Sequence, residues 1–223
     1  MQALNNHSII KLVDNRTHKA FVQDRTVYQP VNKGIVAETN GVYSKGTELY
    51  FYEHGLSKVD NYYALDNKNV FMVDGLLVVP GVIVRKVSHE QHLGFTTAGS
   101  QEWFEVVMSE LPGIEPVDIV IIRTNMSQKF IYSGQELFFL QPHSIMLIVD
   151  NNNEIKPGPA YELIQQVNDT PSFFKYTVAG KNKGLLRGHM VYFKHKVFTV
   201  DIAGESFHVV PRDEIYGIDG NYA

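Results

Sequence analysis

Apolar residues recur along this chain of 223 residues with a period of 71 positions. Four columns of the pattern are apolar in every copy: Val36, Val107 and Val178; Leu49, Val120 and Val191; Tyr50, Ile121 and Tyr192; Phe51, Ile122 and Phe193. Agreement of four columns in one register is uncommon by chance, so the pattern indicates an internal repeat. We expect Val36, Val107 and Val178 to take equivalent inward positions, and Val120 and Val191 to lie in core strands.

Each copy of the repeat has the pattern of several short strands. Apolar runs predict opening strands at 9–13, 82–87 and 162–167, and closing strands at 70–73, 145–149 and 215–218. Between them, a turn-like pair precedes a run of β-branched and aromatic residues in every copy. No helical periodicity is sustained over three turns, and the segment 101–109 also favours a strand. The sequence therefore predicts an all-β fold of three tandem small β-barrels, at 1–75, 76–152 and 153–223.

Very short linkers join the three predicted barrels. Asp74 and Gly75 join the first copy to the second and residues 150–153 join the second to the third, and both segments are strong turn formers. Such a tight turn favours a hairpin between the closing strand of one copy and the opening strand of the next. The outermost strands, 9–13 and 215–218, are then expected to be free edges that invite head-to-tail pairing, which predicts a homo-oligomer.

Charge and composition narrow the classes of function. Twenty Lys and Arg residues stand against 24 Asp and Glu, and the net charge of −4 comes without a basic run, which disfavours nucleic-acid binding. No window approaches about 18 consecutive apolar residues, and the N-terminal sequence is unlike a secretion signal. We therefore expect a protein without membrane association, in the cytoplasm or, if a phage encodes it, in a virion. The chain has no cysteine, which excludes disulfides and thiolate chemistry.

The sequence predicts neither an enzyme nor a cofactor site. It contains no phosphate-binding loop and no dinucleotide fingerprint, and nothing marks a nucleophile together with its base. His89, Glu90 and His92 are a possible set of metal ligands. Their spacing brings side chains to one face only in a helix, however, and this glycine-containing segment is predicted to be a loop. We expect a non-enzymatic protein that binds no metal.

Several short segments resemble a known family. In the middle copy they are 79–86 (VPGVIVRK), 117–121 (VDIVI) and 142–148 (PHSIMLI); the third copy has counterparts at 155–157, 188–193 and 210–215, and the degenerate first copy keeps 34–37 and 46–51. In order and spacing these segments resemble the opening, central and closing strands of the GroES-type co-chaperonin family. The resemblance implies three GroES-like β-barrels and a protein that assists a chaperonin in protein folding.

The resemblance also implies where a partner binds. In that family a mobile loop after the opening strand contacts the chaperonin through a short apolar stretch. The corresponding stretches here are Ala20, Phe21 and Val22 in the first copy and Leu93, Gly94 and Phe95 in the second. An apolar residue in a polar loop is covered either by its own domain or by a partner, and the sequence leaves both open. It also leaves open a second function, that of a structural component of a phage particle or another large assembly.

Overall fold

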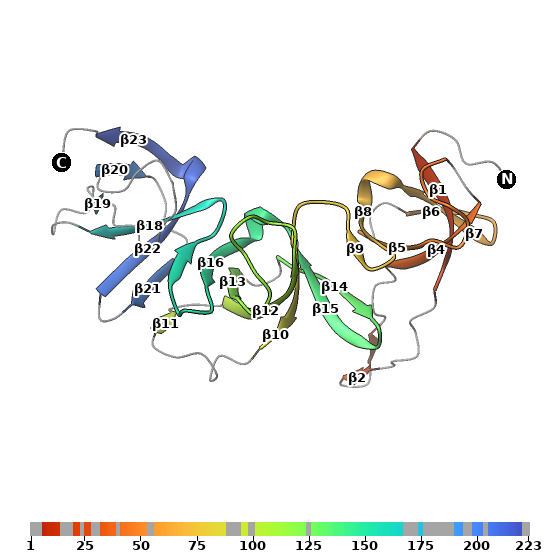
Figure 1. The fold of residues 1–223 in the computed structure, drawn as a ribbon, viewed down its shortest axis with the longest axis horizontal. Helices are drawn as coiled ribbons and strands as arrows, with labels where there is room; N and C mark the ends of the chain where they lie inside the picture. Colours follow the sequence, from red (N-terminus) through yellow and green to blue (C-terminus); the bar gives the residue numbers. More distant parts are fainter. Residues whose placement is uncertain are drawn as a thin grey trace. The chain divides into compact units, whose positions relative to one another are not determined.

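The computed structural model describes residues 6–13, 20–22, 25–27, 32–38, 41–52, 56–87, 95–97, 101–123, 126–166, 174–175, 190–193, 198–202 and 205–219. In these residues the chain is built from antiparallel strands and contains no α-helix, which confirms the predicted all-β fold (Figure 1). No helical segment of the described ranges has the length and apolar character needed to cross a membrane.

Three seven-stranded sheets share the order of six of their strands; the seventh follows the closing strand in the first two sheets and precedes the outer hairpin in the third. The first sheet contains, in order, β6 (Leu56–Val59), β7 (Tyr62–Asp66), β1 (His7–Leu12), β4 (Lys33–Glu38), β5 (Glu48–Phe51), β8 (Val70–Val73) and β9 (Leu76–Leu77). The second contains β14 (Gln128–Tyr132), β15 (Gln135–Leu140), β10 (Val82–Lys86), β12 (Gln101–Ser109), β13 (Ile119–Arg123), β16 (Ile145–Val149) and β17 (Ile155–Pro157). The third contains β11 (Phe95–Thr97), β21 (Phe198–Ile202), β22 (Glu205–Pro211), β18 (Tyr161–Gln166), β19 (Phe174–Lys175), β20 (Met190–Phe193) and β23 (Ile215–Asp219).

Each sheet repeats one motif. An outer hairpin, β6–β7, β14–β15 or β21–β22, flanks the opening strand, which is β1, β10 or β18. On the other side of the opening strand follow the second strand (β4, β12 or β19), the third strand (β5, β13 or β20) and the closing strand (β8, β16 or β23). A 3-10 turn precedes each closing strand, at Asn67–Asn69, Pro142–Ser144 and Arg212–Glu214. The pairing of the third with the closing strand shifts register at Tyr50/Phe51, Ile121/Ile122 and Tyr192/Phe193. Successive register shifts are 71 positions apart, so the predicted period of 71 residues holds for the third strand of each copy.

Each sheet contributes an apolar cluster on one face. The clusters include Ile10, Val36, Leu49 and Phe51 in the first sheet, Val84, Val106, Val120 and Ile122 in the second, and Ile164, Val191 and Val210 in the third. Val120 and Val191 are fully buried, which confirms their prediction as core residues. Because side chains alternate along a strand, Tyr50 and Ile121 belong to the opposite face of their sheets. We call that opposite face the outer face.

The prediction of closed barrels is wrong for the part of the chain that the structure describes. There the sheets are open: β6 and β9 end the first sheet and β14 and β17 end the second, and these end strands do not pair with each other. The outer hairpins, which the sequence analysis missed, add strands beyond each opening strand. As a result β1 pairs with both β4 and β7, and the predicted free edge at 9–13 does not exist. The other predicted edge, 215–218, lies in β23 at the end of the third sheet.

The expected inward position of Val107 is also wrong. Val36 is 1% exposed, whereas Val107 is 42% exposed and its neighbour Val106 is buried. The backbone N–H of Val36 donates to the carbonyl of Thr47, and the backbone N–H of Val106 donates to the carbonyl of Asp118. Thr47 and Asp118 each directly precede the third strand of their sheet, so Val106 is the counterpart of Val36. The connection after the second strand is one residue longer in the second copy, and this shortens the period to 70 at that strand. Val178 lies outside the described residues.

The linkers form hairpins, but not with the strands that were predicted. β8 turns at Asp74 and Gly75 and pairs with the short β9, and β16 likewise pairs with β17. The opening strands β10 and β18 begin only after a break at Pro80 and Pro157–Gly158. Proline has no backbone N–H to donate, so it interrupts a ladder of hydrogen bonds.

By packing, the chain divides into two compact units. One consists of Met1–Pro80 with Gln128–Leu137, and the other of Gly81–Ser127 with Phe138–Ala223. The tip of hairpin β14–β15 therefore packs with the first sheet, while its base, through Phe138 and Phe139, pairs with β10. Three domains bounded at 75/76 and 152/153 stay a prediction.

Two neighbouring valines test the corrected register. We expect Val106→Asp to destabilise the fold by several kcal/mol, because an unpaired carboxylate enters an apolar cluster, and the matched Val107→Asp to cost about 0.5 kcal/mol or less, because that side chain is exposed. Urea unfolding of both variants measures the difference. Equal losses of stability would contradict the assignment of Val106 to the position of Val36.

Candidate interaction surfaces

The apolar stretch of the first copy lies in a small separate hairpin. β2 (Ala20–Val22) pairs antiparallel with β3 (Arg25–Val27), and Phe21 stands opposite Thr26. In the described residues neither strand joins one of the three large sheets. An isolated two-stranded hairpin is at best marginally stable in water. The pairing of β2 with β3 therefore adds little stability to the stretch Ala20–Val22.

The apolar stretch of the second copy ends in a strand that is already paired. Phe95 begins β11, which pairs antiparallel with β21, Thr96 standing opposite Asp201. Because β21 belongs to the outer hairpin of the third copy, the loop of one copy adds a strand to the next copy. Leu93 and Gly94 lie outside the described residues. The β-branched Thr96 and Thr97 were a strand signal that the interpretation as a loop missed.

Aromatic rings cover the outer face of the first sheet, inside the first compact unit. Tyr50 of β5 and Phe71 of β8 each lie edge-on to Phe130 of β14, with ring centroids 5.4 Å apart and an interplanar angle of 67° in both pairs. The ring centroid of Tyr132, in the same hairpin, lies 5.8 Å from that of Tyr50. Such pairs contribute about 0.5–1.5 kcal/mol each beyond the burial of their surface. We call this contact of sheet and hairpin the first junction.

Two further contacts fix the hairpin at the first junction. The buried side-chain amide of Asn32, at the end of the loop of the first copy, donates a hydrogen bond to the backbone carbonyl of Lys129 in β14. The Tyr132 phenol lies so close to Gly75 that a Cβ atom there would collide with it. Gly75 also has a φ of 85°, which glycine adopts without strain. Both the close approach of Tyr132 and the positive φ therefore favour glycine at position 75, in the turn between β8 and β9.

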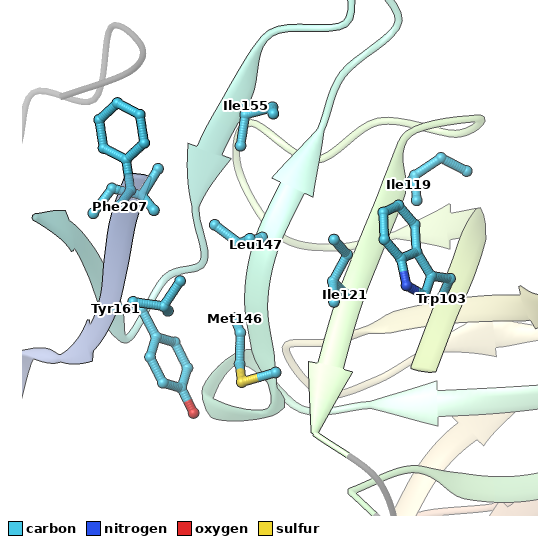
Figure 2. Packing of buried hydrophobic residues seen from close by; sticks show 10 residues of the cluster. Trp103, Ile119, Ile121, Met146, Leu147, Ile155, Tyr161 and Phe207 are labelled. Atoms are coloured by element: carbon cyan, nitrogen blue, oxygen red, sulfur yellow. The ribbon is translucent and has the colours of Figure 1, made fainter. Parts of the chain in front are cut away.

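The same arrangement recurs in the second compact unit (Figure 2). Its apolar cluster consists of Trp103, Ile119, Ile121, Met146, Leu147 and Ile155 from the second sheet and Tyr161, Leu163, Phe207 and Val209 from the third copy. Figure 2 shows Met146 between Ile121 of its own sheet and the ring of Tyr161. The Tyr161 hydroxyl donates a hydrogen bond of 3.0 Å to the backbone carbonyl of His143. We call this contact the second junction.

A polar network lies beside the first junction. Lys33 Nζ is 2.7 Å from Glu48 Oε2, and the Tyr50 hydroxyl donates a hydrogen bond of 2.5 Å to Glu48 Oε1. Burial raises the pKa of Glu48, but the hydrogen bonds from Lys33 and Tyr50 and the charge of Lys33 outweigh it, so the pKa lies below its ordinary value. Burial, and then the bond to the Glu48 carboxylate, raise the pKa of Tyr50. Tyr50 therefore stays neutral: its ring packs among the aromatic rings, while its hydroxyl donates to Glu48.

The buried carboxylates of the second unit serve the fold. Glu162 is 1% exposed and its Oε1 lies 2.7 Å from Arg212 Nε. Burial raises the pKa of Asp118, although its carboxylate accepts a hydrogen bond from the backbone N–H of Glu115. Among the described residues no group of three or more His, Cys, Asp or Glu could hold a metal ion, and His89–His92 lies outside them.

No protein-family model matches the chain, and no curated protein matches its sequence. The resemblance to the GroES-type co-chaperonin family stays a prediction. What the chain does must be inferred from its own contacts.

The Glu48 network makes stability depend on pH in a defined direction. A lowered pKa in the folded state stabilises the fold above the pKa of the unfolded chain, about 4.3, and this contribution is lost as pH falls through the folded value. We expect Glu48→Gln to lower the melting temperature at neutral pH and to flatten its decline between about pH 5 and pH 3. Glu38→Gln, at an exposed position, is the control. An unchanged acid slope in Glu48→Gln would contradict the network.

Proposed function

We propose that this chain is a non-enzymatic structural component of a larger assembly, such as a phage particle, built from linked copies of one β motif. The observation that carries the proposal is the pairing of β11 with β21. This loop segment would have to be free to bind a chaperonin as a co-chaperonin loop does, and here it is paired with the chain's own next copy.

The junctions support the same proposal. Each one combines apolar rings or side chains with polar contacts to backbone, as at Asn32 and Lys129 in the first and Tyr161 and His143 in the second. Such contacts fix the geometry of neighbouring elements, since backbone carbonyls accept only from well-placed donors. A building block needs this fixed geometry, whereas a binding loop needs freedom to order on its partner.

A co-chaperonin-like role is the second candidate, and one observation favours it. The hairpin of β2 and β3 carries Ala20, Phe21 and Val22 and is joined to no large sheet in the described residues. A marginally stable hairpin can rearrange onto a partner at little cost. In this case the chaperonin contact would be made by the first copy rather than by the segment around Phe95.

A disulfide lock separates the two candidates. Thr96 and Asp201 stand opposite each other in β11 and β21, and opposed residues of antiparallel strands have the Cα separation that a disulfide needs. The chain has no cysteine, so Thr96→Cys with Asp201→Cys gives a single defined bridge. We expect the oxidised and reduced forms to show the same oligomeric mass by native mass spectrometry, and neither to bind a chaperonin in the presence of nucleotide.

The matched control is Thr96→Cys alone, which adds a thiol without an intramolecular bridge. Nucleotide-dependent binding of a chaperonin by the wild-type chain would overturn the structural proposal. If oxidation of the double variant then abolished this binding, the contact would be assigned to the segment at β11; if oxidation left it intact, the contact would be assigned to β2.

A further inference from the structure

The outer hairpins of the second and third sheets differ at one edge. In the third sheet β11, from the loop of the second copy, pairs with β21. In the second sheet β14 is the last strand, and within the described residues no strand pairs with its outer side. The edge of a sheet carries N–H and C=O groups that favour the addition of a further strand.

The loop of the first copy has a strand at the place where the loop of the second copy has β11. Val36 and Val106 are counterparts and lie 70 positions apart. The same shift along the loop takes β3 (Arg25–Val27) exactly onto β11 (Phe95–Thr97). In the structure β3 pairs with β2 on one side, and within the described residues no strand pairs with its other side.

The two outer hairpins are in the same register as the two loops. Each has a connection of two residues, between Tyr132 and Gln135 in one hairpin and between Ile202 and Glu205 in the other. These turns are again 70 positions apart, so each residue of β14 corresponds to the residue of β21 at that shift.

The two shifts together define one expected pairing. Thr96 of β11 stands opposite Asp201 of β21. Moved back by 70 positions, this pair becomes Thr26 of β3 opposite Ile131 of β14. Both strands belong to the first compact unit.

The backbone directions of Thr26 and Ile131 fit this pairing. In a two-residue hairpin the residues next to the turn exchange hydrogen bonds, and along each strand such residues alternate with residues whose backbone groups face the other side. Tyr132 is next to its turn, so the N–H and C=O of Ile131 face away from β15. Arg25 stands opposite Val22 across a two-residue connection, so the N–H and C=O of Thr26 face away from β2.

One contact already brings the loop to this edge. The Asn32 side-chain amide donates to the carbonyl of Lys129, which is two residues from Ile131 and by the same alternation faces the open side of β14. Asn32 lies only five positions after Val27, the end of β3. The chain therefore holds β3 at high effective concentration beside β14.

We propose that the open edge of β14 is a strand-binding site and that its occupant is β3 of the same chain, in the register that places Thr26 opposite Ile131. Docking keeps the bonds between β2 and β3, since it uses the other side of β3. The marginally stable hairpin thereby joins a large sheet, which supplies the support that two strands alone lack. The stretch Ala20–Val22 in β2 then becomes the edge of the second sheet.

Amide exchange in β14 tests for the docked strand. We expect the amide hydrogen of Ile131 to exchange as slowly as those of Phe130 and Tyr132, which pair with β15, because the backbone of Thr26 covers it. Thr26→Pro removes an N–H from the added ladder, so Ile131 should lose its protection while Phe130 and Tyr132 keep theirs. Thr26→Val, which keeps the N–H and a β-branched side chain, is the control and should retain the protection. Equally fast exchange of Ile131 in the wild type and in Thr26→Pro would overturn the proposal.

A disulfide at the proposed pair tests the identity of the occupant. Thr26→Cys with Ile131→Cys should form a bridge within one chain on mild oxidation, because opposed residues of antiparallel strands have a suitable Cα separation. Thr26→Cys with Ser57→Cys puts the second thiol at an exposed position of β6 in the same compact unit, and this control should stay reduced. A bridge in the control or no bridge in the test pair would overturn the proposal. A bridge formed only between chains would also overturn it, because the edge would then bind a second copy.

The inference rests on strand register and not on the proposed function. Nucleotide-dependent binding of a chaperonin by the wild-type chain overturns the proposed function alone. Loss of the protection and of the bridge expected at Ile131 overturns the docking of β3 alone.

Discussion

The structure depends on the need to cover both faces of each sheet. In the first and second sheets one face holds the copy's own apolar cluster, and the other presents Tyr50 with Phe71 or Ile121 with Met146. Leaving such side chains in water forgoes about 1.5–3 kcal/mol each. The outer hairpin of the next copy covers this face, so the junctions are cores in their own right and the motif is completed by its neighbour.

The loops follow the same constraint. A loop that crosses from one copy to the next can satisfy its backbone by pairing with the outer hairpin that lies there, as β11 does with β21. Asn32 makes the corresponding contact with one side-chain amide instead of a strand. Strand pairing and side-chain bonding are thus two solutions to one problem, because buried or edge backbone groups need partners in either case.

The sequence predicted what local pattern determines. The closing strands β8 and β16 lie where their apolar runs placed them, and the 71-residue period holds at the third strands. The outer hairpin of the first copy escaped notice because residues such as Ser57 and Lys58 are polar and exposed, so β6 lacks an apolar run. Val107 was misplaced because one extra residue in a connection shifts the register, which a fixed period cannot reveal. The junctions join residues about 80 positions apart, such as Tyr50 and Phe130, and no local pattern encodes that contact.

Linking the copies in one chain changes what a junction must supply. Within the chain a short linker holds hairpin and face at high effective concentration, so modest ring pairs and one or two polar contacts suffice. A junction between chains must also offset the loss of translational and rotational freedom. An internal junction therefore needs fewer contacts than a junction between separate chains would need.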